Sequence, residues 1–92
     1  MMKFAWHDAK ERANIAKHGL DFRTAARVFL DPDLLEFEDE RDYDESRWNA
    51  VGMVEGRILF VTYTERADNI RIISARGAEP HERRRYHARD RI

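Results

Sequence analysis

The strongest constraint on the fold is a pair of apolar segments that a very short turn separates. Residues 48–54 and 57–64 are rich in β-branched and aromatic residues, and only Glu55-Gly56 lies between them. This spacing is typical of a β-hairpin, because a two-residue turn joins neighbouring antiparallel strands. A further strand is expected at residues 69–76, after a turn at 67–69. The pattern predicts an antiparallel sheet in which 57–64, the most apolar segment, is the central strand.

Two short helices are predicted before this sheet. Asp8 and Glu11 have the spacing of a capping box, and Gly19 can take the left-handed conformation that closes a helix. Asp21 is the expected N-cap of the second helix, and Asp31-Pro32 is expected to end it. The apolar stripe of the second helix consists of Phe22, Ala25, Ala26 and Phe29.

The remaining elements complete an α+β fold. Residues 4–6 are expected to form a short first strand, residues 34–38 an edge strand and residues 80–90 a C-terminal helix. The order is β-α-α-β-β-β-β-α, a small antiparallel β-sheet with two N-terminal helices packed on it. The apolar anchors available to the last helix are Tyr86, Ala88 and Ile92.

Size and residue usage limit the class of protein. We expect the 92 residues, 1–92, to form a single domain, because a chain of this length can bury only one modest core. The absence of cysteine excludes disulfides and thiolate zinc sites. The first residues become polar before a signal peptide could form, and no apolar run is long enough for a membrane span. A soluble, cytoplasmic protein without a membrane partner is expected.

The charges are sorted along the chain although the net charge is only −1. Residues 31–45 contain nine acids against Arg41 alone, so the rest of the chain is basic. Fourteen of the 17 cationic side chains are arginine, which suits bidentate contact with phosphate. A nucleic-acid surface is one interpretation, and a GC-rich genome with solvated arginines is the other. The acidic stretch could be a solvated loop, fold back near the basic half, or recruit a basic partner.

The residue types present suit cleavage of RNA without a metal or another cofactor. The four histidines lack a metal-binding spacing, and no phosphate loop or nucleophile elbow is present. Glu, His or Lys can take the proton of the 2′-hydroxyl and protonate the 5′-oxygen, and Arg can stabilise the phosphorane. No metal site is therefore expected.

Candidate residues cluster around the last strand, where each also has a structural interpretation. Arg71 and Arg76 are five residues apart and point to opposite faces of a regular strand, unless a bulge near Ser74 or Ala75 re-aims one. Glu65 and Arg66 are expected in the loop that precedes this strand. Salt bridges within the sheet are the alternative for the arginines. Further candidates are Lys17 and His18, which also suit a helix C-terminus, and Arg83, Arg84 and Arg85, which also suit a solvated helix face. Trp6 and Trp48 are expected in the core or on the sheet rather than as base-stacking platforms.

Taken in order, these motifs resemble the BrnT toxin family. The resemblance begins with F-x-W-x-x-x-K-x-x-x-N-x-x-K-H-G at residues 4–19 and continues through Phe29-Leu30-Asp31-Pro32. It is most specific at I-R-I-I-S-A-R, residues 70–76, and at E-R-R-R-Y, residues 82–86. The ordered set covers nearly the whole chain, whereas a single K-H-G would be weak.

The resemblance implies a RelE-like fold and a metal-independent endoribonuclease that leaves a 2′,3′-cyclic phosphate, inhibits translation and arrests growth. It also implies a BrnA-type antitoxin with a ribbon-helix-helix domain, in a two-plus-two complex that contacts DNA only through the antitoxin. Within the site, it suggests Glu65 or His18 as general base and the arginines as phosphate ligands. The residues carried over are Lys17, His18, Glu65, Arg71, Arg76 and Arg85, with Arg66, Arg83 and Arg84 as further RNA contacts. A non-catalytic RNA-binding module and a protein-interaction subunit are the alternatives to an enzyme.

Overall fold

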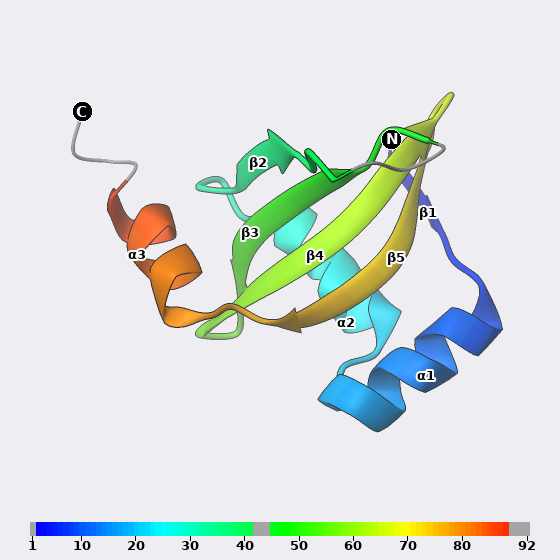
Figure 1. Ribbon diagram of the computed structural model, residues 1–92, viewed down its shortest axis with the longest axis horizontal. Coiled ribbons are helices and arrows are strands. Elements are labelled where there is room, and N and C mark those ends of the chain that lie inside the picture. Colours follow the sequence, from blue (N-terminus) through cyan, green and yellow to red (C-terminus); the bar gives the residue numbers. More distant parts are fainter. Residues whose placement is uncertain (1, 42–44, 89–92) are drawn as a thin grey trace.

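A five-stranded sheet with the order β1-β5-β4-β3-β2 forms the centre of the computed structural model, which describes residues 2–41 and 45–88 (Figure 1). The strands are β1 (Lys3–Ala5), β2 (Leu35–Glu38), β3 (Trp48–Val54), β4 (Arg57–Arg66) and β5 (Asn69–Gly77). The helices are α1 (Asp8–His18), α2 (Phe22–Ala26), the 3-10 helix η1 (Arg27–Leu30) and α3 (Pro80–Ala88). The predicted mixed α+β class and the central position of β4 are confirmed.

The prediction of a wholly antiparallel sheet is wrong for one pair of strands. β1 pairs parallel with β5, whereas the β2–β3, β3–β4 and β4–β5 pairs are antiparallel. A tight turn forces the antiparallel arrangement of β3 and β4, and Glu55 and Gly56 take positive φ angles of 50° and 80° there. No such turn constrains β1, because helices rather than a hairpin follow it in the chain.

The predicted capping box at the start of α1 is also wrong. The N-cap is His7, and its side chain makes no capping hydrogen bond. Asp8 is already the first helical residue, and the Glu11 carboxylate instead accepts a hydrogen bond from the backbone N–H of Phe22 at 2.9 Å. Glu11 therefore ties α1 to the start of α2, an interaction that local spacing does not reveal.

The turn between α1 and α2 forms as predicted and is fixed to the sheet. Gly19 has a φ of 67° and closes α1, and the Asp21 carboxylate accepts the N–H of Thr24 at 3.0 Å as the N-cap of α2. The buried Asn14 side chain exchanges two hydrogen bonds with the backbone of Ala75 in β5, at 2.8 and 3.0 Å. These bonds hold α1 against one face of the sheet.

The main core lies between this face and α2 with η1. Phe22, Ala25 and Val28 have no exposed surface, and complete burial of an apolar side chain contributes roughly 1.5–3 kcal/mol. The predicted stripe is divided, because α2 ends at Ala26 and the next turn is the 3-10 helix η1. That turn brings Val28 against Gly52 of β3, where an added Cβ would lie 3.0 Å from the Val28 Cβ.

The aromatic residues at the edge of this core match the prediction in part. Phe29 meets the ring of the buried Tyr63 edge-on at 5.1 Å, and Trp6 meets Phe22 in the same way at 6.1 Å. Trp48 lies on β3 with 37% of its surface exposed. Trp6 is therefore a core-edge residue, and Trp48 lies at the surface of the sheet.

The opposite face of the sheet is covered at one end by α3 (Figure 1). Tyr86 is the buried anchor of this helix, and its hydroxyl donates to the Asp31 carboxylate at 2.6 Å. Ala88 is exposed, contrary to its predicted role as an anchor. Ile92 and the predicted helix end at Asp90 lie outside the described residues. Among the helices that the structure describes, none is long and apolar enough to cross a membrane.

Candidate functional site

A β-bulge on β5 decides which side chains share the second face of the sheet. Thr62 pairs with Ser74 and Tyr63 pairs with Ile72, so Ile73 is an extra residue on β5. On a regular strand Arg71 and Arg76 would point to opposite faces. The extra residue re-aims one of them, which is the exception that the sequence left open.

Both arginines consequently lie on the face opposite α1 and α2. Ile70, Ile72 and Ala75 of the same strand all enter the main core, which leaves Arg71 and Arg76 on the other side. Register pairs Arg71 with Thr64, Ser74 with Thr62 and Arg76 with Phe60. We call this side of the sheet the open face, and its residues on β3, β4 and β5 include Asn49, Phe60, Thr62, Thr64, Arg71, Ser74 and Arg76.

A charged cluster of Arg66, Arg71 and Glu45 lies at the β4–β5 turn end of the open face. The guanidinium of Arg71 donates to both carboxylate oxygens of Glu45, at 3.0 and 3.2 Å. The guanidinium of Arg66 lies 3.7 Å from the same carboxylate, and the Arg66 side chain is 71% exposed. The side chains of Arg71 and Glu45 are 28% and 29% exposed, so both groups are accessible from solvent.

The prediction that Glu65 and Arg66 lie in a loop is wrong. They are the last two residues of β4. The hairpin ladder extends further than the apolar run because Glu65 pairs with Ile70 and Arg66 with Asn69. Strand alternation places Glu65 on the side of Tyr63, away from the open face. The structure therefore brings Arg66, but not Glu65, to the side of Arg71.

Arg76 is held by carboxylates of α3 rather than directed to solvent. Its guanidinium donates to the two oxygens of Glu82 at 2.8 and 2.9 Å and lies 4.3 Å above the Phe60 ring. Burial alone raises the pKa of Glu82, but hydrogen bonds and the charge of Arg76 outweigh it and lower this pKa below its usual value. The hydrogen bonds that Arg76 donates to Glu82 in turn raise the pKa of Arg76. The geometry matches the structural interpretation of this arginine.

The same carboxylates account for a group of possible metal-ligating atoms. Among the residues described, Glu79, His81 and Glu82 have ligand atoms within 4.8 Å of one another. Arg76 already pairs with Glu82, and it lies 3.5 Å from Glu79. The arginine supplies the positive charge that these acids need, so the group is explained as an ion-pair network.

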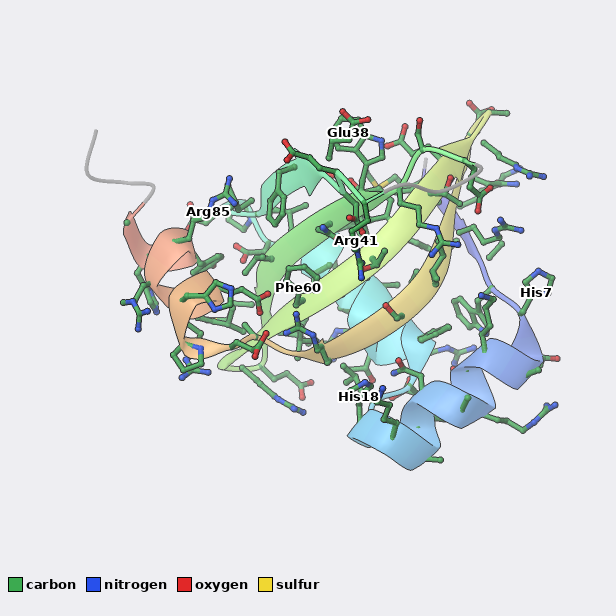
Figure 2. All side chains as sticks on the ribbon, viewed as in Figure 1. His7, His18, Glu38, Arg41, Phe60 and Arg85 are labelled. Carbon is green, nitrogen blue, oxygen red and sulfur yellow. The ribbon has the colours of Figure 1, made fainter. Side chains whose placement is uncertain are left out.

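Lys17 and His18 lie in the helical layer, on the other side of the sheet from Arg71. They form the basic last turn of α1, which packs on β5 through Asn14. Figure 2 shows His18 at the end of this helix, well apart from the labelled Phe60 and Arg85. The structure does not bring Lys17 and His18 together with the arginines of the open face.

The three consecutive arginines of α3 make different contacts. Arg83 donates to the backbone oxygen of Ala78 at 2.6 Å, and Arg84 is exposed. Only Arg85 reaches toward the open face, where its guanidinium lies 4.3 Å above the Phe37 ring. Arg85 is therefore the member of this run that borders the open face.

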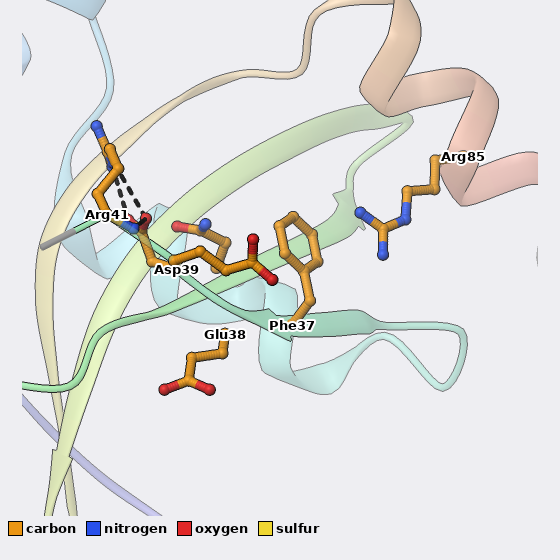
Figure 3. Close-up of a pocket in the computed structure, with 7 residues that line it drawn as sticks. Phe37, Glu38, Asp39, Arg41 and Arg85 are labelled. Atoms are coloured by element: carbon orange, nitrogen blue, oxygen red, sulfur yellow. Dashed lines mark hydrogen bonds and ion pairs between the residues drawn. The ribbon is translucent and has the colours of Figure 1, made fainter.

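Arg85 and Phe37 border a pocket of about 600 Å³ between β2, the segment that follows it and α3 (Figure 3). Asp39 in this pocket is buried and binds Arg41 through two side-chain hydrogen bonds of 2.7 and 3.0 Å. Those hydrogen bonds lower the pKa of Asp39 against the opposing effect of burial. The lining residues are Phe37, Glu38, Asp39, Glu40, Arg41, Asn49 and Arg85.

Glu45 and Phe37 are two contact-making residues of this face that the sequence analysis did not single out. Glu45 was one of nine acids in the stretch 31–45, and the suggestion that this stretch folds back on the basic half holds for Glu45. Strand alternation within 34–38 was the available signal for Phe37, because it separates this ring from the neighbouring acids. Residues 42–44 of the predicted polar loop lie outside the described part of the chain.

Comparison with known proteins identifies the family. Residues 6–82, more than half of the chain, match the family described as the ribonuclease toxin BrnT of a type II toxin–antitoxin system. No curated protein matches the chain. The matched range contains both β-strands of the Arg66–Arg71–Glu45 cluster and ends at Glu82, the partner of Arg76. The chain therefore belongs to the BrnT family of ribonuclease toxins of type II toxin–antitoxin systems.

Proposed function

We propose that this toxin is a metal-independent endoribonuclease whose cleavage site is the Arg66–Arg71–Glu45 cluster on the open face. The observation that carries the proposal is the register of β4 and β5, which pairs Arg71 with Thr64 on the open face, where its guanidinium donates to Glu45. Family membership supports ribonuclease activity, and the cluster adds the charges that a phosphate and its neighbouring hydroxyl require.

Each member of the cluster has a role that its chemistry permits. Arg71 and Arg66 bind the scissile phosphate and stabilise the charge that develops on it. The Glu45 carboxylate accepts the proton of the 2′-hydroxyl, and the 2′-oxygen then forms a bond to phosphorus. The bond from phosphorus to the 5′-oxygen breaks, and this oxygen takes a proton from solvent. The products are a 2′,3′-cyclic phosphate and a free 5′-hydroxyl.

Glu65 and His18 stay alternative proposals for the general base. The family resemblance suggests them, whereas strand alternation and the position of α1 separate them from Arg71. The Glu45→Gln, Glu65→Gln and His18→Ala variants distinguish the three. We expect the largest loss of the cleavage rate, roughly 100-fold or more, in the variant that lacks the base.

We further propose that the protein partner is a BrnA-type antitoxin in a two-plus-two complex, as the family resemblance suggests. Contact with operator DNA then belongs to the ribbon-helix-helix domain of the antitoxin. A RelE-like fold is part of the same proposal, and the layer of helices on one face of the sheet is compatible with it.

Expression in bacteria tests the proposed activity. The wild type should arrest growth and cleave cellular RNA, and Arg71→Ala should do neither, because the phosphate loses its main ligand. Arg12→Ala changes an exposed arginine of α1 and should behave like the wild type. Arrest by Arg71→Ala, with RNA cleavage unchanged, would contradict the assignment of the site.

A further inference from the structure

The pocket beside Arg85 is separate from the Arg66–Arg71–Glu45 cluster. It shares no lining residue with that cluster, although both border the open face. Figure 3 shows Phe37 between Arg85 on one side and the Asp39–Arg41 pair on the other. An RNA strand bound at the cluster has neighbouring nucleotides that must lie somewhere along this face.

Phe37 gives the pocket a surface that accepts flat groups. Its ring is half-buried and meets the ring of Phe60 at 6.2 Å, which fixes its orientation. The guanidinium of Arg85, a flat cation on an exposed side chain, already lies 4.3 Å above it. A nucleobase is also flat and gains about 1–3 kcal/mol by stacking on an aromatic ring. Arg85 can rotate outward to admit a base and then cover its other side.

The polar lining supplies both hydrogen-bond donors and acceptors. Asn49 is 6% exposed, and its Oδ1 accepts the Thr62 hydroxyl at 2.9 Å, which orients its NH₂ group as a donor. The Asp39 carboxylate is engaged by Arg41. Glu38 alternates with Phe37 on β2, and its carboxylate points away from the ring (Figure 3). Glu40 is therefore the acid of the pocket that is placed to accept hydrogen bonds from a ligand.

We propose that this pocket binds a guanine base of the RNA substrate, an inference that rests on the proposed function. Guanine presents N1–H and N2–H₂ donors along one edge, which match the two oxygens of Glu40. Its O6 or N7 acceptor matches the NH₂ donor of Asn49, while the Arg85 guanidinium covers the outer face of the base. A cationic side chain of a protein partner offers only donors, so it would pair with Glu40 but leave the donors of Asn49 and Arg85 unmatched. The mixed lining thus favours guanine over a basic peptide.

Replacement of guanine by hypoxanthine, which lacks the N2 amino group, tests the contact with Glu40. Two RNAs of otherwise identical sequence carry guanosine or inosine at one position near the cleaved bond. Further pairs of RNAs place the same substitution at each neighbouring position in turn. At one fixed position the wild type should show kcat/KM about tenfold higher for guanosine, because a hydrogen bond to a charged group is lost with inosine. Glu40→Gln should bring this ratio close to one, and Phe37→Leu should raise KM for both RNAs. Glu55→Gln, an exposed acid on the β3–β4 turn, is the matched control and should keep the ratio.

A binding measurement separates this proposal from the proposed cleavage. The same RNAs with methylated 2′-hydroxyls cannot be cleaved, and fluorescence anisotropy gives their Kd. Tighter binding of the guanosine RNA by the wild type, with no such preference in Glu40→Gln, supports the guanine pocket whether or not RNA is cleaved. Absence of cleavage by the wild type would overturn the proposed nuclease activity, not the pocket. Equal affinity of the wild type for both RNAs overturns the guanine pocket. The guanine pocket is also overturned if Glu40→Gln and Phe37→Leu keep the RNA selectivity of the wild type but bind purified antitoxin more weakly. The pocket is then a protein-docking site.

Discussion

At the scale of single residues, the two arginines of β5 show how one residue type serves two purposes. Arg76 is surrounded by Glu79, Glu82 and the Phe60 ring, so its charge is used within the protein. Arg71 shares one carboxylate, that of Glu45, with the exposed Arg66. In the proposed site, an incoming phosphate binds Arg71 and Arg66 beside a carboxylate that is already partly exposed. The two arginines are equivalent by sequence and differ only in their surroundings.

The surroundings of Arg76 predict that its substitution lowers the stability of the protein. Arg76→Met leaves the buried Glu82 without its cation and should lower the free energy of unfolding by about 2 kcal/mol. The exposed Arg84→Ala should change it by less than about 0.5 kcal/mol. Urea unfolding followed by circular dichroism measures both. Equal, small losses in the two variants would show that the Arg76–Glu82 pair contributes no net stability.

The pH dependence of the Arg76→Met effect follows from the lowered pKa of Glu82. A carboxyl whose pKa is lower in the folded state stabilises the fold above its unfolded pKa, near the ordinary value of 4.5, and loses this effect as the pH falls through the folded value. The stability difference between the wild type and Arg76→Met should therefore shrink as the pH falls through the acidic range. Unfolding curves at a series of acidic pH values check this, and a difference that grows on acidification would contradict the direction of the shift.

At the scale of elements, hydrogen bonds at helix starts distinguish two aspartates that look alike in the sequence. Asp21 caps α2 through the N–H and hydroxyl of Thr24, at 3.0 and 2.7 Å. Asp8 lies inside α1, whose N-cap is His7. Both were predicted as N-caps, and only the one at Asp21 is confirmed. The capping box at Asp8 failed because Glu11 binds the N–H of Phe22 instead.

Matched substitutions should separate these two positions. Asp21→Ala should lower the free energy of unfolding by about 1 kcal/mol, because a capping hydrogen bond is lost. Asp8→Ala removes only an acid near the helix N-terminus, which is worth roughly 0.3–1 kcal/mol at low salt and is screened by salt. In high salt the Asp21→Ala loss should therefore persist while the Asp8→Ala loss disappears. Equal losses in high salt would mean that Asp8 caps α1 in solution.

At the scale of the whole molecule, local sequence patterns predicted the elements of the fold but not the pairing of segments that are distant in the sequence. The turn at Glu55-Gly56 specifies the β3–β4 hairpin within a few residues, so it was readable from the sequence. The parallel pairing of Phe4 with Ile70 joins distant segments that no local pattern relates. Prediction of the site has the same limit. Glu45 and Arg71 are 26 residues apart, and a count of charges does not show which acid pairs with which arginine. The spacing of Arg71 and Arg76 allowed a bulge near Ser74 or Ala75, which the structure has at the neighbouring Ile73, but it did not require one.

The arrangement of charge over the whole molecule predicts how RNA binding depends on salt. Arg66 and Arg71 should each displace counterions from RNA, so affinity should fall steeply as salt rises. The slope of log K against log salt should decrease in magnitude by about 1.4 in the Arg66→Ala/Arg71→Ala double variant, at about 0.7 per phosphate contact. Anisotropy titrations with 2′-O-methylated RNA measure this slope. The Arg76→Met slope should equal that of the wild type, and a decrease there as large as in the double variant would place Arg76 in contact with RNA.

The most direct test of metal-independent cleavage on the open face is digestion of a defined RNA by the purified protein in EDTA, with analysis of the product ends. We predict that the wild type cleaves at full rate and leaves 2′,3′-cyclic phosphates and 5′-hydroxyls, while folded Arg71→Ala loses roughly 100-fold or more of the rate. Loss of wild-type activity in EDTA, with recovery on addition of a divalent cation, would contradict the proposed mechanism.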